Sequence, residues 1–185
     1  MKLTRRLLLS AVAFSAALGA ASLVRAADEH TIYLDTKDGR VTIKLWPDVA
    51  PKHVERIEKL AKEHFYDNIV FHRVIDGFMA QAGDPTGTGM SGSRYLDVKA
   101  EFSDKPFKRG TLGMARDPSD KDSANSQFFI VVADQPQLNG KYTAFGEVVS
   151  GMEIVDKIKK GDKAENGKVT DPDKIIKMRV AGDAS

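Results

Sequence analysis

Several short runs of the chain alternate apolar and polar residues, which is the pattern of strands with one buried face. Thr31–Thr36 and Val41–Trp46 alternate in this way around Asp38-Gly39, a dipeptide typical of a two-residue hairpin turn. A last alternating run is Ile176–Val180, and short β-rich runs occur at Ile69–Ile75, Phe78–Ala82, Thr111–Met114, Gln127–Val132 and Thr143–Val149. The chain is therefore predicted to be mainly β.

Two segments have helical spacing instead. Pro51 suits the first position of a helix, and the apolar positions that follow it are Val54, Ile57, Leu60 and Ala61. A shorter helix is expected at Ile154, Val155 and Ile158, with Gly161 placed to end it. Many short strands and two helices favour an antiparallel barrel or a sandwich whose ends the helices close, and the pattern alone does not choose between them.

Residues 1–26 have the organisation of a secretory signal peptide. A basic start is followed by an apolar run from Leu7 to about Leu18, and Val24-Arg25-Ala26 is a plausible cleavage site. The run is too short for a membrane span, so an uncleaved anchor is the weaker alternative. Thr4–Leu9 matches part of a twin-arginine signal, which leaves the export route open. We expect an exported, periplasmic protein, cleaved near Ala26, with one domain over residues 27–185 and no membrane attachment.

The charge balance changes once the leader is removed. The whole chain has 28 Lys and Arg against 26 Asp and Glu. Four basic residues, Lys2, Arg5, Arg6 and Arg25, lie in the leader, so 24 remain against 26 acidic ones, a net charge of −2. This balance gives no support to binding of nucleic acid or of a membrane surface. The absence of cysteine excludes disulfides, thiolate metal sites and cysteine nucleophiles.

Other familiar motifs lack the neighbouring structure or the spacing that their function needs. Residues 87–92 match G-x-G-x-x-G, but a dinucleotide site needs a helix directly afterwards, and residues 93–97 lack helical apolar spacing. The four histidines, His30, His53, His64 and His72, have no metal-ligand spacing. His53 and His64 fall on the charge-rich helix and are expected to be solvated. No metal and no cofactor is therefore expected.

Two distant segments carry the most specific pattern. The first, Phe71–Asp84, sets Arg73 among large apolar residues with Gln81 downstream, and such an arginine is costly unless it has a task. The second runs from Gly110 through Ala115-Arg116, residues 123–130 and residues 138–142 to Phe145-Gly146. Together, from about Thr31 to Val180, they resemble the cyclophilin family of peptidyl-prolyl cis/trans isomerases. The resemblance implies a closed eight-stranded antiparallel barrel capped by two helices.

The resemblance also implies an activity, rotation about X-Pro bonds in proline-containing polypeptides, which assists the folding of exported proteins. An ordinary peptide bond resists rotation by roughly 18–20 kcal/mol, and X-Pro exchange takes tens to hundreds of seconds. Reaching milliseconds means an acceleration of about 10⁴–10⁵, or roughly 5.5–7 kcal/mol. No covalent bond breaks, so the catalyst needs no nucleophile or metal. It must favour the twisted amide, whose nitrogen can accept a hydrogen bond.

Each candidate site residue is carried over from the matching position of the family. Arg73 is expected to bind the prolyl residue, Gln81 to orient Arg73, and Phe129 to complete the catalytic set. The residues expected to bind substrate are Phe78, Met79, Ala115, Arg116, Gln127, Leu138 and Tyr142, with Phe78, Met79, Phe129 and Leu138 forming an apolar proline pocket. Phe71, Phe128 and Ile130 are expected in the core, because Phe128 and Ile130 alternate with Phe129.

The chain departs from the family at two positions. Tyr142 stands where eukaryotic members have histidine, and a tyrosine can still pack on proline. Gln137 stands where cyclosporin-sensitive members have tryptophan, so weak inhibition by cyclosporin is expected with activity retained.

Two other functions stay open. The groove could serve a proline-peptide-binding chaperone or assembly factor without essential turnover, or the chain could be a scaffold that binds a partner through an outer barrel face. A monomer is expected, because no exposed apolar helix or long uncovered edge stands out.

Overall fold

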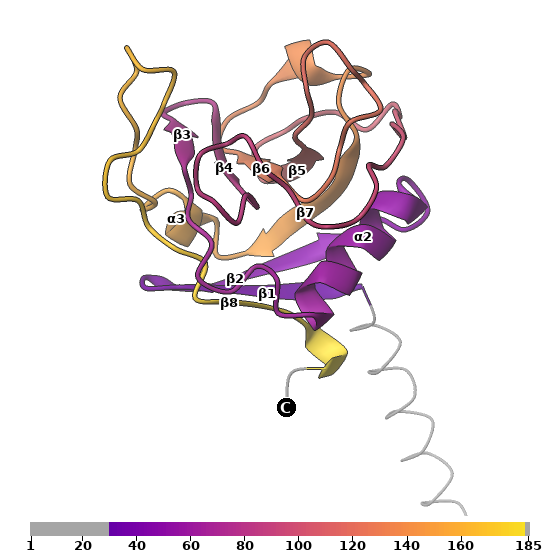
Figure 1. The fold of residues 1–185 in the computed structure, drawn as a ribbon, viewed down its shortest axis with the longest axis horizontal. Helices are drawn as coiled ribbons and strands as arrows, with labels where there is room; N and C mark the ends of the chain where they lie inside the picture. Colours follow the sequence, from indigo (N-terminus) through magenta and orange to yellow (C-terminus); the bar gives the residue numbers. More distant parts are fainter. Residues whose placement is uncertain (1–29, 184–185) are drawn as a thin grey trace, which may run out of the picture.

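The computed structural model describes residues 30–183, so the predicted leader lies outside the described residues. The fold is mainly β, with one antiparallel eight-stranded sheet in the order β3-β4-β6-β5-β7-β2-β1-β8 (Figure 1). The strands are β1 (Thr31–Thr36), β2 (Gly39–Leu45), β3 (Arg73–Ile75), β4 (Met79–Ala82), β5 (Thr111–Met114), β6 (Phe128–Val131), β7 (Ala144–Ser150) and β8 (Lys177–Val180). Each strand overlaps one of the runs predicted to be β.

The sheet is an open half-barrel, and the prediction of a closed ring of strands is wrong. The strands β3 and β8 are its two edges, and no ladder joins them. The segment before β8 runs alongside β3 and bridges the gap by backbone hydrogen bonds, among them Phe71 N to Asp173 O at 2.9 Å and Val74 N to Gly167 O at 2.8 Å (Figure 1). Asp171 has a left-handed backbone and Pro172 lacks an N–H, which interrupts a continuous strand there.

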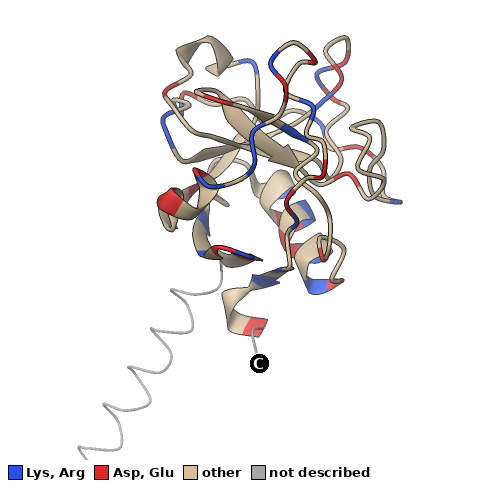
Figure 2. Ribbon diagram, turned by 90° about the vertical axis from the view of Figure 1, so that its left-hand side faces the viewer, with Lys and Arg blue, Asp and Glu red and all other residues tan. Residues whose placement is uncertain are grey.

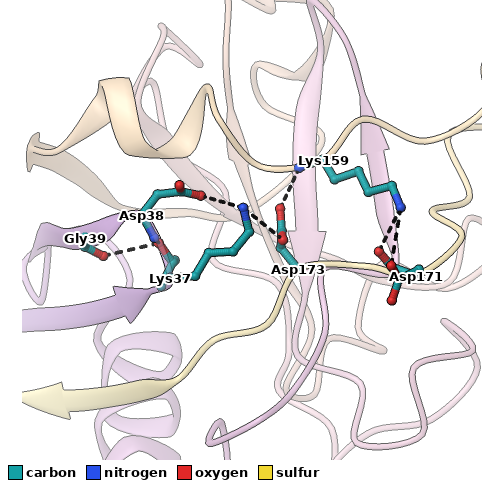
Figure 3. A network of polar contacts seen from close by, with 7 residues as sticks. Lys37, Asp38, Gly39, Lys159, Asp171 and Asp173 are labelled. Atoms are coloured by element: carbon teal, nitrogen blue, oxygen red, sulfur yellow. Dashed lines mark hydrogen bonds and ion pairs between the residues drawn. The ribbon is translucent and has the colours of Figure 1, made fainter.

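Polar contacts near the surface hold Asp173, which lies in the segment that bridges this gap (Figure 3). The Lys37 ammonium lies 3.0 Å from Asp38 and 3.5 Å from Asp173, and Asp173 also accepts a hydrogen bond from the Lys159 backbone N–H at 2.8 Å. Lys37 and Asp38 form the hairpin turn, with Thr36 paired to Gly39. The predicted hairpin is thus confirmed, but its turn lies one residue earlier than Asp38-Gly39.

Helix α2 (Pro51–Lys62) begins at Pro51 as predicted and buries the four predicted apolar residues. The second helix, α3 (Met152–Val155), is shorter than expected and ends at Val155. Gly161 does not end it. The Gly161 N–H donates to Val74 O at 2.9 Å, and a Cβ at Gly161 would lie 1.9 Å from Gly167 O. Close approach of two backbones, rather than helix termination, therefore requires this glycine.

The prediction that His53 is solvated is wrong. Its side chain is fully buried, and Nδ1 lies 2.7 Å from Oε2 of Glu101. Glu101 also accepts from the backbone N–H groups of Lys52 and His53, so it caps the start of α2, where Ala50 offers no side-chain cap. Burial lowers the pKa of His53, against the opposing effect of Glu101. His64 is exposed, as expected.

Alternate residues of the strands pack into two separate apolar clusters. Phe71, Phe128 and Ile130 are fully buried in the larger cluster, between the sheet and α2, as predicted. Met79, Phe129 and Val131 belong to a smaller cluster on the opposite face of the sheet. This second cluster forms the floor of the candidate site.

Charged residues of both signs are interspersed along the loops and edges, and much of the interior is uncharged (Figure 2). Across residues 30–183, no group of three or more His, Asp or Glu is arranged to hold a metal ion. No helix in this range is long and apolar enough to cross a membrane. No helix follows directly after the glycine-rich residues 87–92, as their spacing predicted.

Candidate active site

A single row of residues across four strands brings the two predicted segments together. The pairing sets Arg73 opposite Gln81, Gln81 opposite Phe129, and Phe129 opposite Gly113. Residues directly opposite each other in an antiparallel sheet share a face. Their chain neighbours Val74 and Ala80 lie in the main core, so this row points outward. Strand register therefore explains why an arginine and a glutamine eight residues apart meet.

The Phe129 ring fills the space that Gly113 leaves. A Cβ on Gly113 would lie 2.3 Å from Cζ of Phe129 and 2.7 Å from the ring of Phe107. Phe129 stacks on Phe107 with ring centroids 5.9 Å apart and meets Tyr142 edge-on at 5.7 Å. Three aromatic rings thus hold each other in the geometries that aromatic pairs prefer.

A cavity of about 330 Å³ lies above this floor. It is lined by Arg73, Phe78, Met79, Gln81, Ala115, Arg116, Pro118, Phe129, Leu138, Tyr142 and Asn166. Nine of the ten predicted site residues are in this set. The tenth, Gln127, lines a neighbouring cavity of about 450 Å³ that shares Gln81, Ala115, Arg116 and Pro118 with the first.

Arg73 is half-buried at the rim of the cavity, and neutral groups hold its guanidinium. Nη1 donates to Oε1 of Gln81 at 3.1 Å, Nε donates to the Asn166 backbone oxygen at 3.0 Å, and Nη2 donates to Oδ1 of Asn166 at 2.9 Å. No ion pair to Arg73 occurs within residues 30–183, which argues against its being part of a surface salt bridge. Burial lowers the pKa of Arg73, yet guanidinium stays protonated in proteins.

A chain of side-chain amides fixes the orientation of Gln81. Nε2 of Gln81 donates to Oε1 of Gln127 at 2.9 Å, and Nε2 of Gln127 donates to the carbonyl oxygens of Gly89 and Ser91 at 3.1 and 2.8 Å. A carbonyl can only accept, so these two carbonyls set the direction of both amides. Oε1 of Gln81 is thereby turned toward Arg73. Gln127 supports the site from behind and does not line the cavity of Arg73.

Arg116 braces the Tyr142 wall of the cavity. Its guanidinium lies 4.7 Å from the centre of the Tyr142 ring and donates to the carbonyl oxygens of Asp117 at 2.8 Å and Lys141 at 3.2 Å. Such a planar cation over a ring is an attractive arrangement. Gln137 is exposed on the short helix Pro136–Leu138.

Sequence reasoning missed two lining residues, Asn166 and Pro118. Asn166 contacts Arg73 across 93 positions of the chain, and no apolar periodicity marks its loop. The only available signal was the dipeptide Asn166-Gly167, which is typical of turns and says nothing about a partner.

The chemistry of this cavity is noncovalent. Met79, Phe129 and Leu138 are 1%, 5% and 7% exposed, so its floor is apolar, and the Arg73 guanidinium is held at its rim. Such a site can bind a small apolar ring and present N–H groups of Arg73 to an atom that becomes an acceptor.

Comparison with known proteins agrees with this geometry. Residues 31–180 match the family model for cyclophilin type peptidyl-prolyl cis-trans isomerases. The chain is 53% identical, over 188 aligned residues covering 95% of each chain, to a Brucella suis protein named "Probable peptidyl-prolyl cis-trans isomerase". It is 45% identical over 135 residues to peptidyl-prolyl cis-trans isomerase B of Bacillus subtilis, covering 71% of this chain and 92% of that one.

A solved cyclophilin-type isomerase of Cryptosporidium parvum, crystallised in the presence of the dipeptide Ala-Pro, superposes with a TM-score of 0.74. It is 30% identical, and the match covers 81% of this chain and 98% of that one. Together with the family match over nearly all of the described residues, these relatives show that the chain belongs to the cyclophilin-type peptidyl-prolyl cis-trans isomerases.

Proposed function

We propose that the 330 Å³ cavity is the isomerase active site and that Arg73 is the group that acts on the amide. The observation that carries this proposal is the Arg73 guanidinium, charged, half-buried and held by neutral acceptors beside an apolar floor. A binding groove alone would not need an oriented cation there.

In this mechanism the proline ring enters the apolar floor formed by Phe78, Met79, Phe129 and Leu138. The ring is held while the preceding carbonyl turns. As the amide twists, the prolyl nitrogen loses conjugation and becomes an acceptor, and an N–H of Arg73 donates to it. The hydrogen bond is stronger in the twisted state than in the ground state, and only such a difference accelerates the reaction.

The energies require both parts of the site. A charge-assisted hydrogen bond is worth about 1.5–3 kcal/mol in ordinary settings, and a preorganised donor in a water-excluded site about 3–4 kcal/mol. The required reduction of the barrier is roughly 5.5–7 kcal/mol. The remainder must come from the fixed proline ring. Loss of either Arg73 or the apolar grip should therefore leave a measurable residual rate.

The proposed substrates are proline-containing polypeptides. The relative crystallised in the presence of Ala-Pro supports this class, since an apolar cavity beside a donor suits a prolyl residue. We also propose that the protein is a monomer.

The test is the rate of cis/trans exchange in an X-Pro peptide with Arg73→Ala. Removal of one such donor costs about 10²–10³-fold in other enzymes, and we expect a loss of this order. Arg94→Ala, which removes an arginine exposed over 78% of its side chain and not lining the cavity, is the matched control and should keep the wild-type rate. An Arg73→Ala enzyme as fast as wild type would refute the mechanism.

The same variant separates the enzyme from a chaperone that only binds proline segments. Arg73→Ala should bind the peptide within about three-fold of wild type, because the apolar floor supplies most of the buried area. If unfolded clients refold equally well with wild type and Arg73→Ala, the folding function rests on binding, and the turnover proposed here is incidental.

We also propose that the chain acts on exported polypeptides in the periplasm, on the basis of the leader-like residues 1–26. The test is to express the full chain, fractionate the cells and determine the mature amino terminus by mass spectrometry. A periplasmic product beginning near residue 27 is expected, and an uncleaved cytoplasmic product would contradict the proposal.

A further inference from the structure

We propose that Asn166 is a positioning residue that fixes the plane of the Arg73 guanidinium. This inference rests on the proposed role of Arg73. It adds a residue from the loop 162–168, far from both segments that define the site in the sequence.

One residue binds two adjacent donors of the guanidinium. The Asn166 backbone oxygen accepts from Nε at 3.0 Å, and its side-chain Oδ1 accepts from Nη2 at 2.9 Å. Two acceptors along one edge of the planar guanidinium restrict its rotation about the Cδ–Nε bond, as in a bidentate arginine–carboxylate pair. Gln81 binds the other side through Nη1 at 3.1 Å.

These contacts leave donors available for the reaction. A guanidinium has five N–H groups, and the hydrogen bonds found among residues 30–183 use three of them. One N–H therefore remains on Nη1 and one on Nη2. With the edge toward Asn166 fixed, these two N–H groups keep a constant direction relative to the apolar floor.

The backbone at Asn166 explains why an asparagine can do this. Its φ of +54° lies in the left-handed region, which asparagine tolerates better than most residues. The loop itself is held on β3. Val74 N donates to Gly167 O at 2.8 Å, Gly167 N donates to Asp162 O at 2.7 Å, and a Cβ at Gly167 would lie 2.3 Å from Ile75.

The neutrality of Asn166 suits the reaction. A carboxylate at this place would form an ion pair with Arg73 and offset the charge that the twisted amide needs. An amide oxygen and a backbone oxygen orient the guanidinium without adding a negative charge. Both acceptors on Arg73 that come from side chains, Gln81 and Asn166, are uncharged amides.

The test is Asn166→Gly, which removes Oδ1 but keeps the backbone oxygen and tolerates the left-handed φ. Asn166 is exposed, so the fold should be retained, and equal thermal midpoints will verify this. Asn68→Gly is the matched control, because Asn68 is also exposed, has a φ of +63° and does not line the cavity. We expect kcat to fall about 10-fold in Asn166→Gly with little change in KM, and no change in Asn68→Gly.

A double mutant shows whether Asn166 acts through Arg73. If it does, adding Asn166→Gly to Arg73→Ala should change the residual rate less than about two-fold. The inference would be overturned if Asn166→Gly reduced the rate by the same factor in the wild-type and Arg73→Ala backgrounds. It would also be overturned if Asn166→Gly were as fast as Asn68→Gly while Arg73→Ala was impaired. An active Arg73→Ala enzyme would instead refute the proposed function, so the two failures are distinguishable.

Discussion

The two faces of strands β3, β4 and β6 have different roles. Phe128 points inward, where it is fully buried and meets Tyr66 edge-on at 5.6 Å. Phe129, the next residue, points outward and is also nearly buried, but its neighbours leave an open cavity beside it. The inner face is thus closed by α2, while the outer face is apolar at its floor and polar at its rim.

The difference shows what each face requires of its residues. The inner face needs filled volume, because close-packed interiors lose stability when atoms are removed. The outer face must instead keep a space of fixed shape, and it does so with a glycine at position 113 and with amides that hold Arg73. Stability and catalysis should therefore respond to different substitutions of adjacent residues.

The sharpest test of this comparison is the pair Phe128→Ala and Phe129→Ala. Phe128→Ala should lower the free energy of unfolding by about 3–5 kcal/mol, because it empties a closed core. Phe129→Ala should cost less stability, since its cavity side is already open, but should reduce kcat/KM by about 10-fold or more. Urea unfolding gives the free energy of unfolding. The rate of peptide exchange, measured where the variants are still folded, gives kcat/KM.

The matched variants Phe128→Leu and Phe129→Leu keep most of the apolar volume and guard against a Phe128→Ala chain that does not fold. Phe128→Leu should keep near-wild-type activity per folded molecule. If Phe128→Leu loses as much activity as Phe129→Leu, the two faces are not functionally separate and the comparison is wrong.

Much of this arrangement follows from local sequence pattern. The alternation at Phe128, Phe129 and Ile130 predicted which side chains would lie in the core, and the structure confirms it by placing Phe128 and Ile130 in the main cluster and Phe129 in the other. Alternation does not set the register of β3 against β4, which places Arg73 opposite Gln81. The expected contact between these two residues came instead from the family resemblance.

The features that sequence reasoning missed depend on long-range hydrogen bonds. Glu101 accepts from His53 across 48 positions, and Asn166 accepts from Arg73 across 93. A side chain that bonds a distant partner leaves no periodic signal, so His53 was predicted to be solvated and Asn166 was not singled out. The gap between the edge strands β3 and β8 was also missed. Asp171 and Pro172 break the pairing locally within an otherwise extended segment, and the strand pattern does not show this.

A smaller effect is expected from Gly113→Ala, which changes only the outer face. The added Cβ would overlap the Phe129 and Phe107 rings, so the floor must shift. Overpacking of this kind costs about 1–3 kcal/mol, and we expect kcat/KM to fall about 10-fold as Phe129 moves into the cavity.

The control for Gly113→Ala is Gly182→Ala, where a Cβ would meet no atom within 4 Å and φ is not positive. That variant should match wild type in both unfolding and exchange rate. A Gly113→Ala enzyme with wild-type kcat/KM would mean that the position of the Phe129 ring does not limit the reaction.

The smallest expected effect concerns His72 and His53, which the fold turns inward while Arg73 faces out. Burial lowers the pKa of His72, reinforced by the charge of Arg73 and opposed by Asp84, and burial likewise lowers the pKa of His53. Between these lowered values and the ordinary value near 6.5, the unfolded chain binds more protons than the folded one. The free energy of unfolding should therefore rise with pH in this window, and acidification below about pH 6.5 should weaken the fold.

Asp84 contributes in a separate and more acidic window. Its carboxylate is buried, which alone would raise its pKa, but hydrogen bonds from Thr86, Gly89 and Ser91 outweigh burial and lower the pKa instead. The stability that it supplies is retained above about pH 4 and lost as the pH falls further. Loss of stability between pH 7 and 5 therefore reports the histidines and not Asp84.

The measurement is the urea midpoint at pH 7 and at pH 5 for wild type, His72→Gln, His53→Gln and the double variant. Each single variant should lose less stability on acidification than wild type, because a titrating imidazole has been removed, even if its midpoint at pH 7 is lower. If wild type and the His72→Gln/His53→Gln double variant lose stability equally on acidification, burial of these two rings does not control the acid response, and the inner face is less sealed than its packing indicates.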